Sequence, residues 1–218
     1  MNNYKEIEHL KKVDERLAKV IDHIGYLDLK SYNFQFDSFQ FLVSEIVGQM
    51  ISSKVRKIIF NRLLDLCDNN LTPQNISKLS IQDLRGIGLS QSKSKFIINL
   101  ANLTITKQID FSVLNHLSDD EVMKELKTIE GIGNWTAKMY LLFFLQRNDV
   151  LPFEDGAFIQ AYKWLYNTKA IKPTSISRKC KKWKPYSSFG ARYLYKALDN
   201  GLTKIPIKDF LKDIYEKA

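Results

Sequence analysis

The stretch from Leu126 to Met139 constrains the fold of this chain more than any other part. It reads Leu-Lys-Thr-Ile-Glu-Gly-Ile-Gly-Asn-Trp-Thr-Ala-Lys-Met. A capping box, Ser118-x-x-Glu121, predicts a helix that begins just before this stretch and stops at Gly131. A second helix is predicted directly afterwards, because apolar residues recur with the spacing of a buried helical face. These residues are Ala137, Tyr140, Leu141, Phe144 and Leu145.

The turn between these two helices is suited to bind a phosphate group. The opening turn of a helix leaves backbone N–H groups without an intrahelical acceptor. Gly131 and Gly133 carry no Cβ atom, so an anion can approach the backbone closely, and the helix dipole adds attraction. A Gly-x-Gly turn is also typical of a plain connection between helices. The Gly-x-Gly turn alone therefore does not establish a phosphate site, and other features of the sequence have to point to one.

The charge balance favours a polyanionic partner. The 218 residues include 33 Lys and Arg against 24 Asp and Glu, which gives a net charge of +9. Such an excess suits nucleic acid, although basic surfaces also occur without one. A hydrophobic content of 44% with 12% aromatic residues indicates a globular protein.

The cysteine and histidine usage argues against a metal centre. Cys67 and Cys180 are far apart and the three histidines are scattered, so neither a zinc site nor an iron–sulfur cluster is expected. The N-terminus lacks the apolar core of a signal peptide, and the longest apolar run, 139–145, is too short to span a bilayer. We therefore expect a protein of the reducing cytoplasm, or of the nucleoid or nucleus, with no membrane partner.

A loop and a carboxylate follow the hairpin, in Leu151-Pro152-Phe153-Glu154-Asp155-Gly156. Together with Trp135-Thr136-Ala137, this order resembles the helix-hairpin-helix, Gly/Pro-rich loop and aspartate signature of the base-excision DNA glycosylases. The resemblance is closest to the 3-methyladenine DNA glycosylase II branch. It implies double-stranded DNA with a damaged base as the partner. It also implies DNA contacts at the hairpin, from Gly131, Ile132, Gly133 and Thr136.

Two segments of the middle of the chain resemble the same branch. The first contains Gln49-Met50, at the turn that pushes into the DNA in that family. We expect Met50 to fill the gap left by an extruded nucleotide and Gln49 to bond to base edges. The alternative is that Met50 continues the buried stripe of the preceding helix. The second segment is Gly-Leu-Ser-x-x-Lys, where phosphate contacts are expected from Gly88, Ser90 and Lys93.

Asp155 is the expected catalytic residue. The deoxyribose develops oxocarbenium character when its C1′–N bond breaks, and a nearby carboxylate stabilises that charge and orients the attacking water. Its place at the start of a predicted helix also fits a simple N-cap. The resemblance assigns the catalytic position to Asp155 and not to the neighbouring Glu154.

Aromatic side chains are the expected walls of a base pocket. Alkylated purines such as 3-methyladenine and 7-methylguanine carry positive charge, so they gain cation–π attraction from an indole face. The candidates are Trp135, Met139, Trp183, Tyr186 and Phe36. The alternative for each of them is an ordinary place in the core.

The residue at position 135 also bears on the reaction. Bifunctional members of the superfamily carry at the matching position a lysine that forms a Schiff base with the sugar. Trp135 therefore implies a monofunctional enzyme that leaves an intact abasic site. The resemblance further implies that hairpin carbonyls hold a monovalent cation, Na⁺ or K⁺. These are the carbonyls of Lys127, Ile129 and Ile132.

The last segment with this resemblance is Trp-Lys-Pro-Tyr-Ser-Ser, residues 183–188, which follows a strongly basic run from residue 171. Ser187 stands where the branch usually has arginine, which puts a contact made there in doubt. A dense basic run is also typical of a solvated face.

The helical spacing throughout predicts an all-α protein, and we expect it to be a monomer with two lobes. Residues 33–126 are expected to form one lobe, and residues 1–32 with 127–218 the other, with Trp135 and Asp155 in the cleft. Alternation of Tyr32, Phe34 and Phe36 with polar residues is compatible with a short extended segment.

Two other functions stay open at this point. One is a helix-hairpin-helix protein that binds DNA without chemistry, and the other is a related glycosylase for uracil, oxidised or deaminated bases. If Asp155→Asn abolishes base release, the protein is an enzyme and not a DNA-binding protein without chemistry.

Overall fold

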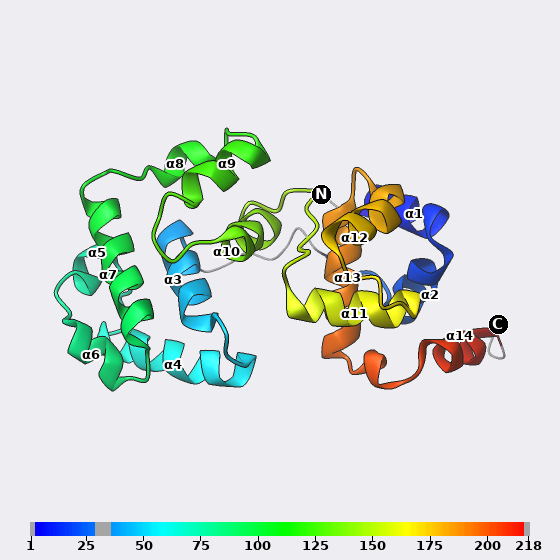
Figure 1. Ribbon diagram of the computed structural model, residues 1–218, viewed down its shortest axis with the longest axis horizontal. Coiled ribbons are helices and arrows are strands. Elements are labelled where there is room, and N and C mark those ends of the chain that lie inside the picture. The colour runs from blue at the N-terminus through cyan, green and yellow to red at the C-terminus, as the bar shows by residue number, and fades with distance from the viewer. Residues whose placement is uncertain (1–2, 29–35, 216–218) are drawn as a thin grey trace. The chain divides into compact units, whose positions relative to one another are not determined.

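The computed structural model describes residues 3–28 and 36–215. Every regular element within these ranges is a helix, which confirms the predicted fold class (Figure 1). No helix in the described ranges is long and apolar enough to cross a membrane. Tyr32 and Phe34, where an extended segment was predicted, lie outside the described residues.

The chain divides into two compact units. Unit 1 comprises Met1–Asn33 and Gln146–Ala218, and unit 2 comprises Phe34–Leu145. The predicted lobes placed residues 127–145 with the C-terminal helices, whereas the observed division places them in unit 2. The physical reason is packing on the helix that begins at Ser38: the Tyr140 hydroxyl is 2.8 Å from Ser38 Oγ, and its ring contacts Phe41 edge to face.

Unit 2 is built around α3, whose side chains are largely buried and which packs against α4, α7 and α10. The capping box predicted at Ser118 is confirmed, and Asp37 and Ser80 close two further capping boxes. The elements of unit 2 are α3 (Ser38–Gly48), α4 (Ser53–Leu66), α5 (Pro73–Ile76), α6 (Ile81–Gly86), α7 (Gln91–Ile105), α8 (Phe111–Leu114), α9 (Asp119–Leu126), α10 (Asn134–Met139) and a π-helical turn (Tyr140–Phe144).

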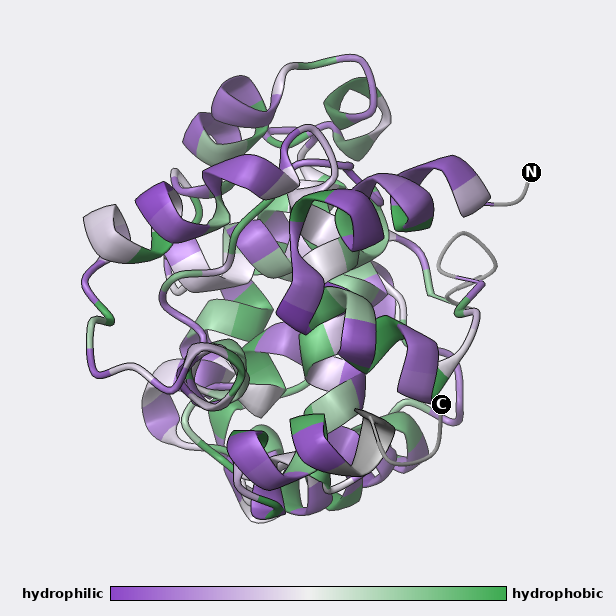
Figure 2. Cartoon of the chain, turned by 90° about the vertical axis from the view of Figure 1, so that its right-hand side faces the viewer, coloured by the Kyte–Doolittle hydropathy of each residue, from purple (hydrophilic) through white to green (hydrophobic). Residues whose placement is uncertain are grey.

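Unit 1 is organised around α13, which packs against α11, α2 and α1. Its helices are amphipathic, with hydrophobic residues (green) and hydrophilic residues (purple) on different sides in Figure 2. The elements are α1 (Tyr4–Val13), α2 (Glu15–Ile24), α11 (Gly156–Tyr166), α12 (Pro173–Cys180), a 3₁₀ turn (Lys181–Trp183), α13 (Ser187–Asp199), a second 3₁₀ turn (Leu202–Lys204) and α14 (Ile207–Tyr215).

Asp14 separates α1 from α2. Its backbone is extended, with φ −141° and ψ 95°, and its side chain accepts a hydrogen bond from the backbone N–H of Leu17 as the N-cap of α2.

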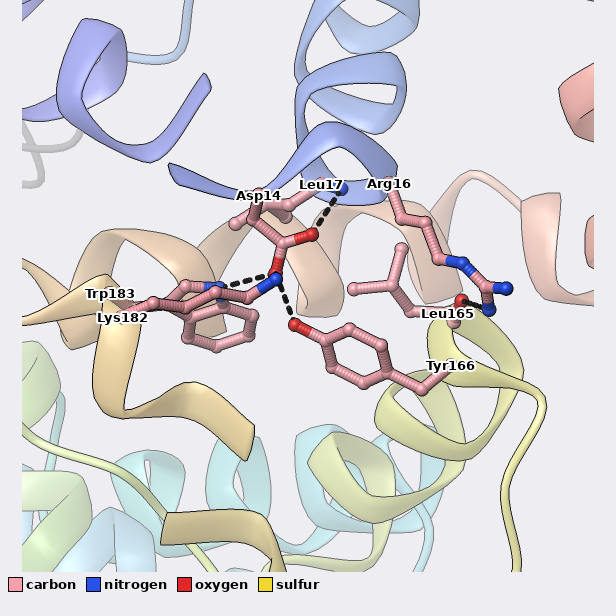
Figure 3. A network of polar contacts seen from close by, with 7 residues as sticks. All are labelled: Asp14, Arg16, Leu17, Leu165, Tyr166, Lys182 and Trp183. Carbon is pink, nitrogen blue, oxygen red and sulfur yellow. Dashed lines mark hydrogen bonds and ion pairs between the residues drawn. The ribbon is translucent and has the colours of Figure 1, made fainter. Parts of the chain in front are cut away.

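The same Asp14 carboxylate is the centre of a buried polar network (Figure 3). Asp14 is 1% exposed, and its Oδ2 accepts hydrogen bonds from Trp183 Nε1 at 2.8 Å and from the Tyr166 hydroxyl. Lys182 Nζ lies 3.1 Å from the same oxygen. Burial alone would raise the pKa of Asp14, but the hydrogen bonds from Tyr166, Trp183 and Lys182 together lower it below its ordinary value.

Candidate functional site

The hairpin between α9 and α10 is a tight turn with no room for a side chain at Gly131. Helix α9 ends at Leu126, earlier than the expected stop at Gly131, and tight backbone turns lead to α10. Gly131 has φ +88°, and a Cβ there would lie 2.3 Å from the ring of Phe96. Gly133 caps α10 without a side chain. The first turn of α10 therefore keeps backbone N–H groups that no capping side chain satisfies, as an anion site requires.

Met50 does not continue the buried stripe of α3. Ile46 and Val47 are fully buried, whereas the Met50 side chain is 101% exposed. Its backbone adopts a left-handed conformation with φ +58°, which is unusual for a residue that is not glycine. The turn therefore presents an apolar side chain to solvent, the arrangement that insertion into a base stack needs.

Gln49 connects this turn to the hairpin. Its Nε2 donates to the carbonyl oxygen of Gly131 at 2.8 Å and to Oγ1 of Thr136 at 3.2 Å. Thr136 is 1% exposed. In this structure the Gln49 amide therefore holds two predicted DNA-binding segments together, a role that the sequence did not indicate.

Lys93 supports the same turn from α7. Its ammonium donates to the carbonyl oxygens of Val47 at 2.9 Å and Gln49 at 2.6 Å. Burial lowers the pKa of Lys93. In this structure the charge of Lys93 is directed to backbone carbonyls next to Met50, and the predicted phosphate contact stays a prediction. Gly88, with φ +107°, and Ser90, which caps α7, are exposed at the start of that helix.

We expect Lys93→Met to lower the free energy of unfolding. Hydrogen bonds from charged groups are worth about 1.5–3 kcal/mol, and two of them end on the turn that carries Met50. Urea unfolding would measure the loss in the free energy of unfolding. The matched control is Lys95→Met, on an exposed position of the same helix. An equal loss in both variants would contradict a role in holding the turn.

Asp155 is the N-cap of α11. Its Oδ1 accepts a hydrogen bond from the backbone N–H of Phe158 at 2.8 Å, and its own N–H donates to the Pro152 carbonyl at 3.0 Å. The side chain is half-buried. The positive end of the helix dipole stabilises a carboxylate at this position. The geometry therefore satisfies the N-cap interpretation and is also compatible with a fixed carboxylate that acts on a substrate.

The predicted wall residues fall into two groups. In unit 2, Trp135 and Phe36 are half-buried, and Phe36 meets Phe60 edge to face with ring centroids 5.4 Å apart. In unit 1, Tyr186 is half-buried and lies edge to face with His9 at 5.2 Å.

Two other candidates are core residues in this structure. Trp183 is fully buried, donates to Asp14 and packs its ring against Gly190, where an added Cβ would be 2.7 Å away. Met139 is 4% exposed. The expectation that these side chains offer a face to a base does not agree with their burial.

Ser187 is also buried. It is the first residue of α13, it is 0% exposed, and its backbone N–H donates to Oδ1 of Asp149 at 3.3 Å. A short side chain fits this enclosed position.

The hairpin carbonyls match the donor type that a monovalent cation prefers, which is backbone oxygen. The carbonyl of Ile129 already accepts the N–H of Ile132 at 3.1 Å, so it would use its second lone pair. Lys127 and Ile132 would supply the other two oxygens. Among the described residues, no group of three His, Cys, Asp or Glu side chains is placed to hold a metal ion.

A glycine-turned helical hairpin, followed by a loop whose aspartate caps the next helix, defines the class of the helix-hairpin-helix DNA glycosylases. Residues 43–185 match the model of the HhH-GPD superfamily base excision DNA repair protein. The chain belongs to this superfamily, and proteins named as 3-methyladenine DNA glycosylases are among those to which it is similar.

Individual relatives agree with this assignment. The chain is similar to DNA-3-methyladenine glycosylase 1 of Schizosaccharomyces pombe, with 28% identity over 193 residues, 86% of this chain and 84% of that protein. The solved structure of S. pombe 3-methyladenine DNA glycosylase (Mag1) in complex with abasic DNA has a TM-score of 0.79 at 28% identity, covering 88% and 96% of the two chains. DNA-3-methyladenine glycosidase from Bacillus halodurans also has a TM-score of 0.79, at 29% identity, covering 96% and 97%.

Proposed function

We propose that the chain is a monofunctional DNA glycosylase that releases alkylated purines, such as 3-methyladenine and 7-methylguanine, from double-stranded DNA. It would act as a monomer and leave an abasic site. The observation that carries the proposal is the placement of Asp155 at the N-terminus of α11, in a chain whose hairpin carries Trp135 and not lysine. The names of the similar proteins support the choice of lesion.

Asp155 would act on the sugar. When the C1′–N bond breaks, its electron pair leaves with the base, and the deoxyribose becomes positively charged. An ionised carboxylate stabilises that charge and orients a water molecule, whose oxygen bonds to C1′ as its proton passes to the carboxylate or to solvent. An alkylated purine is cationic before the bond breaks and leaves as a neutral base, so it needs little help from a general acid.

The other residues would bind and open the duplex. The N–H groups of the Gly131-Ile132-Gly133 turn bind a backbone phosphate, with a monovalent cation on the hairpin carbonyls adding positive charge there. Met50 inserts where the damaged nucleotide leaves the stack. Trp135 offers an aromatic face to the cationic base, with Tyr186 and Phe36 as further candidates.

The test is base release from methylated duplex DNA, followed on a gel with and without alkali. We expect released 3-methyladenine or 7-methylguanine, and strand breaks only after alkali. Breaks without alkali would show that the argument from Trp135 is wrong. DNA binding without release from any damaged duplex would favour the binding-only function, and release from uracil or oxidised duplexes alone would favour another lesion.

Met50→Ala should slow base release by about tenfold. The shorter side chain no longer fills the gap in the stack, and a loss of roughly 1.4 kcal/mol in the stability of the flipped state corresponds to a factor of ten in rate. The free energy of unfolding should barely change, since the side chain is fully exposed. Single-turnover rates on methylated duplex would measure the effect. Val55→Ala, which also truncates an exposed apolar side chain of unit 2, is the control. A rate equal to that of the wild type would contradict insertion.

A further inference from the structure

A hollow of about 430 Å³ lies in unit 1, where the C-terminal end of α11 meets α12. Its size falls in the usual range of small-molecule sites. Polar and basic side chains dominate its wall. The lining residues are Tyr162, Tyr166, Asn167, Thr168, Ala170, Ser175, Arg178, Lys179 and Lys182.

The basic residues of the wall come from one face of α12 and its 3₁₀ extension. Ser175, Arg178, Lys179 and Lys182 follow the i, i+3, i+4, i+7 spacing that places side chains on the same side of a helix. The opposite face is buried, with Ile176 and Cys180 both fully enclosed. Folding therefore gathers three cations around the hollow.

Positive charge in the hollow exceeds the negative charge beside it. Lys182 pairs with the buried Asp14 at 3.1 Å (Figure 3). Arg178 and Lys179 form no ion pair with any residue in the described part of the chain. Lys179 Nζ lies 4.8 Å from the centroid of the Tyr166 ring, and Lys182 Nζ lies 5.8 Å from the same centroid. Two ammonium groups thus share one ring.

Stabilisation of helix ends does not account for this cluster. Cations are favourable near helix C-termini, and both α11 and α12 end here. Yet neither the Arg178 side chain nor the Lys179 side chain donates a hydrogen bond to a carbonyl oxygen of the described chain. Like charges gathered around one hollow repel one another, and a bound anion removes that cost.

We propose that this hollow binds the phosphate group of a nucleotide. Arg178 and Lys179 would pair with the phosphate oxygens, and Asn167, Thr168 and Ser175 would supply neutral hydrogen bonds. A volume of about 430 Å³ exceeds that of a bare phosphate and accommodates part of the molecule that bears it. The source is either a free nucleotide or a nucleotide of a DNA strand.

The hollow is distinct from the candidate catalytic residue. Asp155 lies at the N-terminus of α11 and Asn167 follows its C-terminus, so the two are separated by roughly 18 Å along a helix that rises about 1.5 Å per residue. The proposal therefore does not depend on base release, and its test is made on ligand binding alone.

The test is an NMR titration of the ¹⁵N-labelled protein with deoxyadenosine monophosphate, inorganic phosphate and deoxyadenosine. We expect saturable shifts at Asn167, Thr168 and Ser175 with the first two ligands and none with deoxyadenosine. Arg178→Gln combined with Lys179→Gln should weaken binding about tenfold or more. The matched control is Lys172→Gln combined with Lys181→Gln, which removes the same charge from the same exposed segment outside the hollow.

Duplex binding by the two double variants at equal salt separates the sources. A larger loss of duplex affinity in the Arg178/Lys179 variant than in the control, with deoxyadenosine monophosphate competing, assigns the hollow to DNA. If the Arg178/Lys179 variant loses nucleotide binding while duplex affinity falls equally in this variant and in the control, the hollow is assigned to a free nucleotide. No saturable shift with either phosphate ligand, or the same weakening in both double variants, would overturn the proposal.

Discussion

Asp155→Asn is expected to reduce the rate of base release by about 100- to 1,000-fold, the cost typical of removing one group that stabilises charge in a transition state. Asparagine keeps the shape of the side chain and an oxygen at Oδ1. It can therefore still accept the hydrogen bond from the Phe158 N–H as the N-cap of α11. Only the negative charge is lost, so stability and affinity for duplex DNA should stay close to those of the wild type.

Single-turnover release from methylated duplex measures this effect, with duplex affinity and thermal unfolding measured on the same protein. Glu154→Gln is the matched control, since it removes the same charge from the adjacent exposed residue. An equal loss in the rate of base release in the two variants would mean that the loop contributes only its negative charge, with no specific role for Asp155. Full activity of Asp155→Asn would remove Asp155 from the reaction.

The second large effect is expected on stability, at Asp14. Removing one partner of a buried ion pair costs about 3–5 kcal/mol, because the remaining charge and donors lose their acceptor. In Asp14→Asn, the remaining oxygen can keep the N-cap hydrogen bond from the Leu17 N–H. The new Nδ2 amide group then replaces the oxygen that accepts from Tyr166, Trp183 and Lys182, so hydrogen-bond donors face one another. Urea unfolding should show this loss. The control is Asp22→Asn, which breaks an exposed pair with Lys11 and should cost less than about 1 kcal/mol.

The stabilisation from Asp14 should also depend on pH. The folded state lowers the pKa of Asp14 below its ordinary value of 3.8, so the unfolded state binds the proton more readily. The stabilisation is therefore fully present above pH 3.8 and is lost as pH falls through the folded-state pKa. The difference in free energy of unfolding between wild type and Asp14→Asn should be constant near neutral pH and shrink below about pH 4. A difference in the free energy of unfolding that grows at acid pH would contradict stabilisation by the ionised Asp14 carboxylate.

Much of the local structure could be predicted because its signals are short. Asp37, Ser80, Ser90 and Ser118 mark helix starts through side chains that reach a backbone N–H within three residues. Gly131 and the Asp155 cap are equally local features. The family follows from several such motifs in the right order.

Local signals did not reveal contacts between residues that are far apart in the sequence. Trp183 was a plausible pocket wall until its partner Asp14, 169 residues away in the sequence, placed it in the core. Lys93, for which a phosphate contact is predicted, donates in this structure to carbonyls 44 and 46 residues away.

By itself, the sequence determined an all-helical chain, the starts of many of its helices, the glycine hairpin and the aspartate that caps α11. These depend on hydrophobic spacing and on hydrogen bonds between residues a few positions apart. Only the tertiary structure decided that the hairpin belongs to unit 2, that Gln49 and Lys93 hold the turn carrying Met50, and that Arg178 and Lys179 gather at one hollow. These depend on how elements pack, which no local spacing specifies.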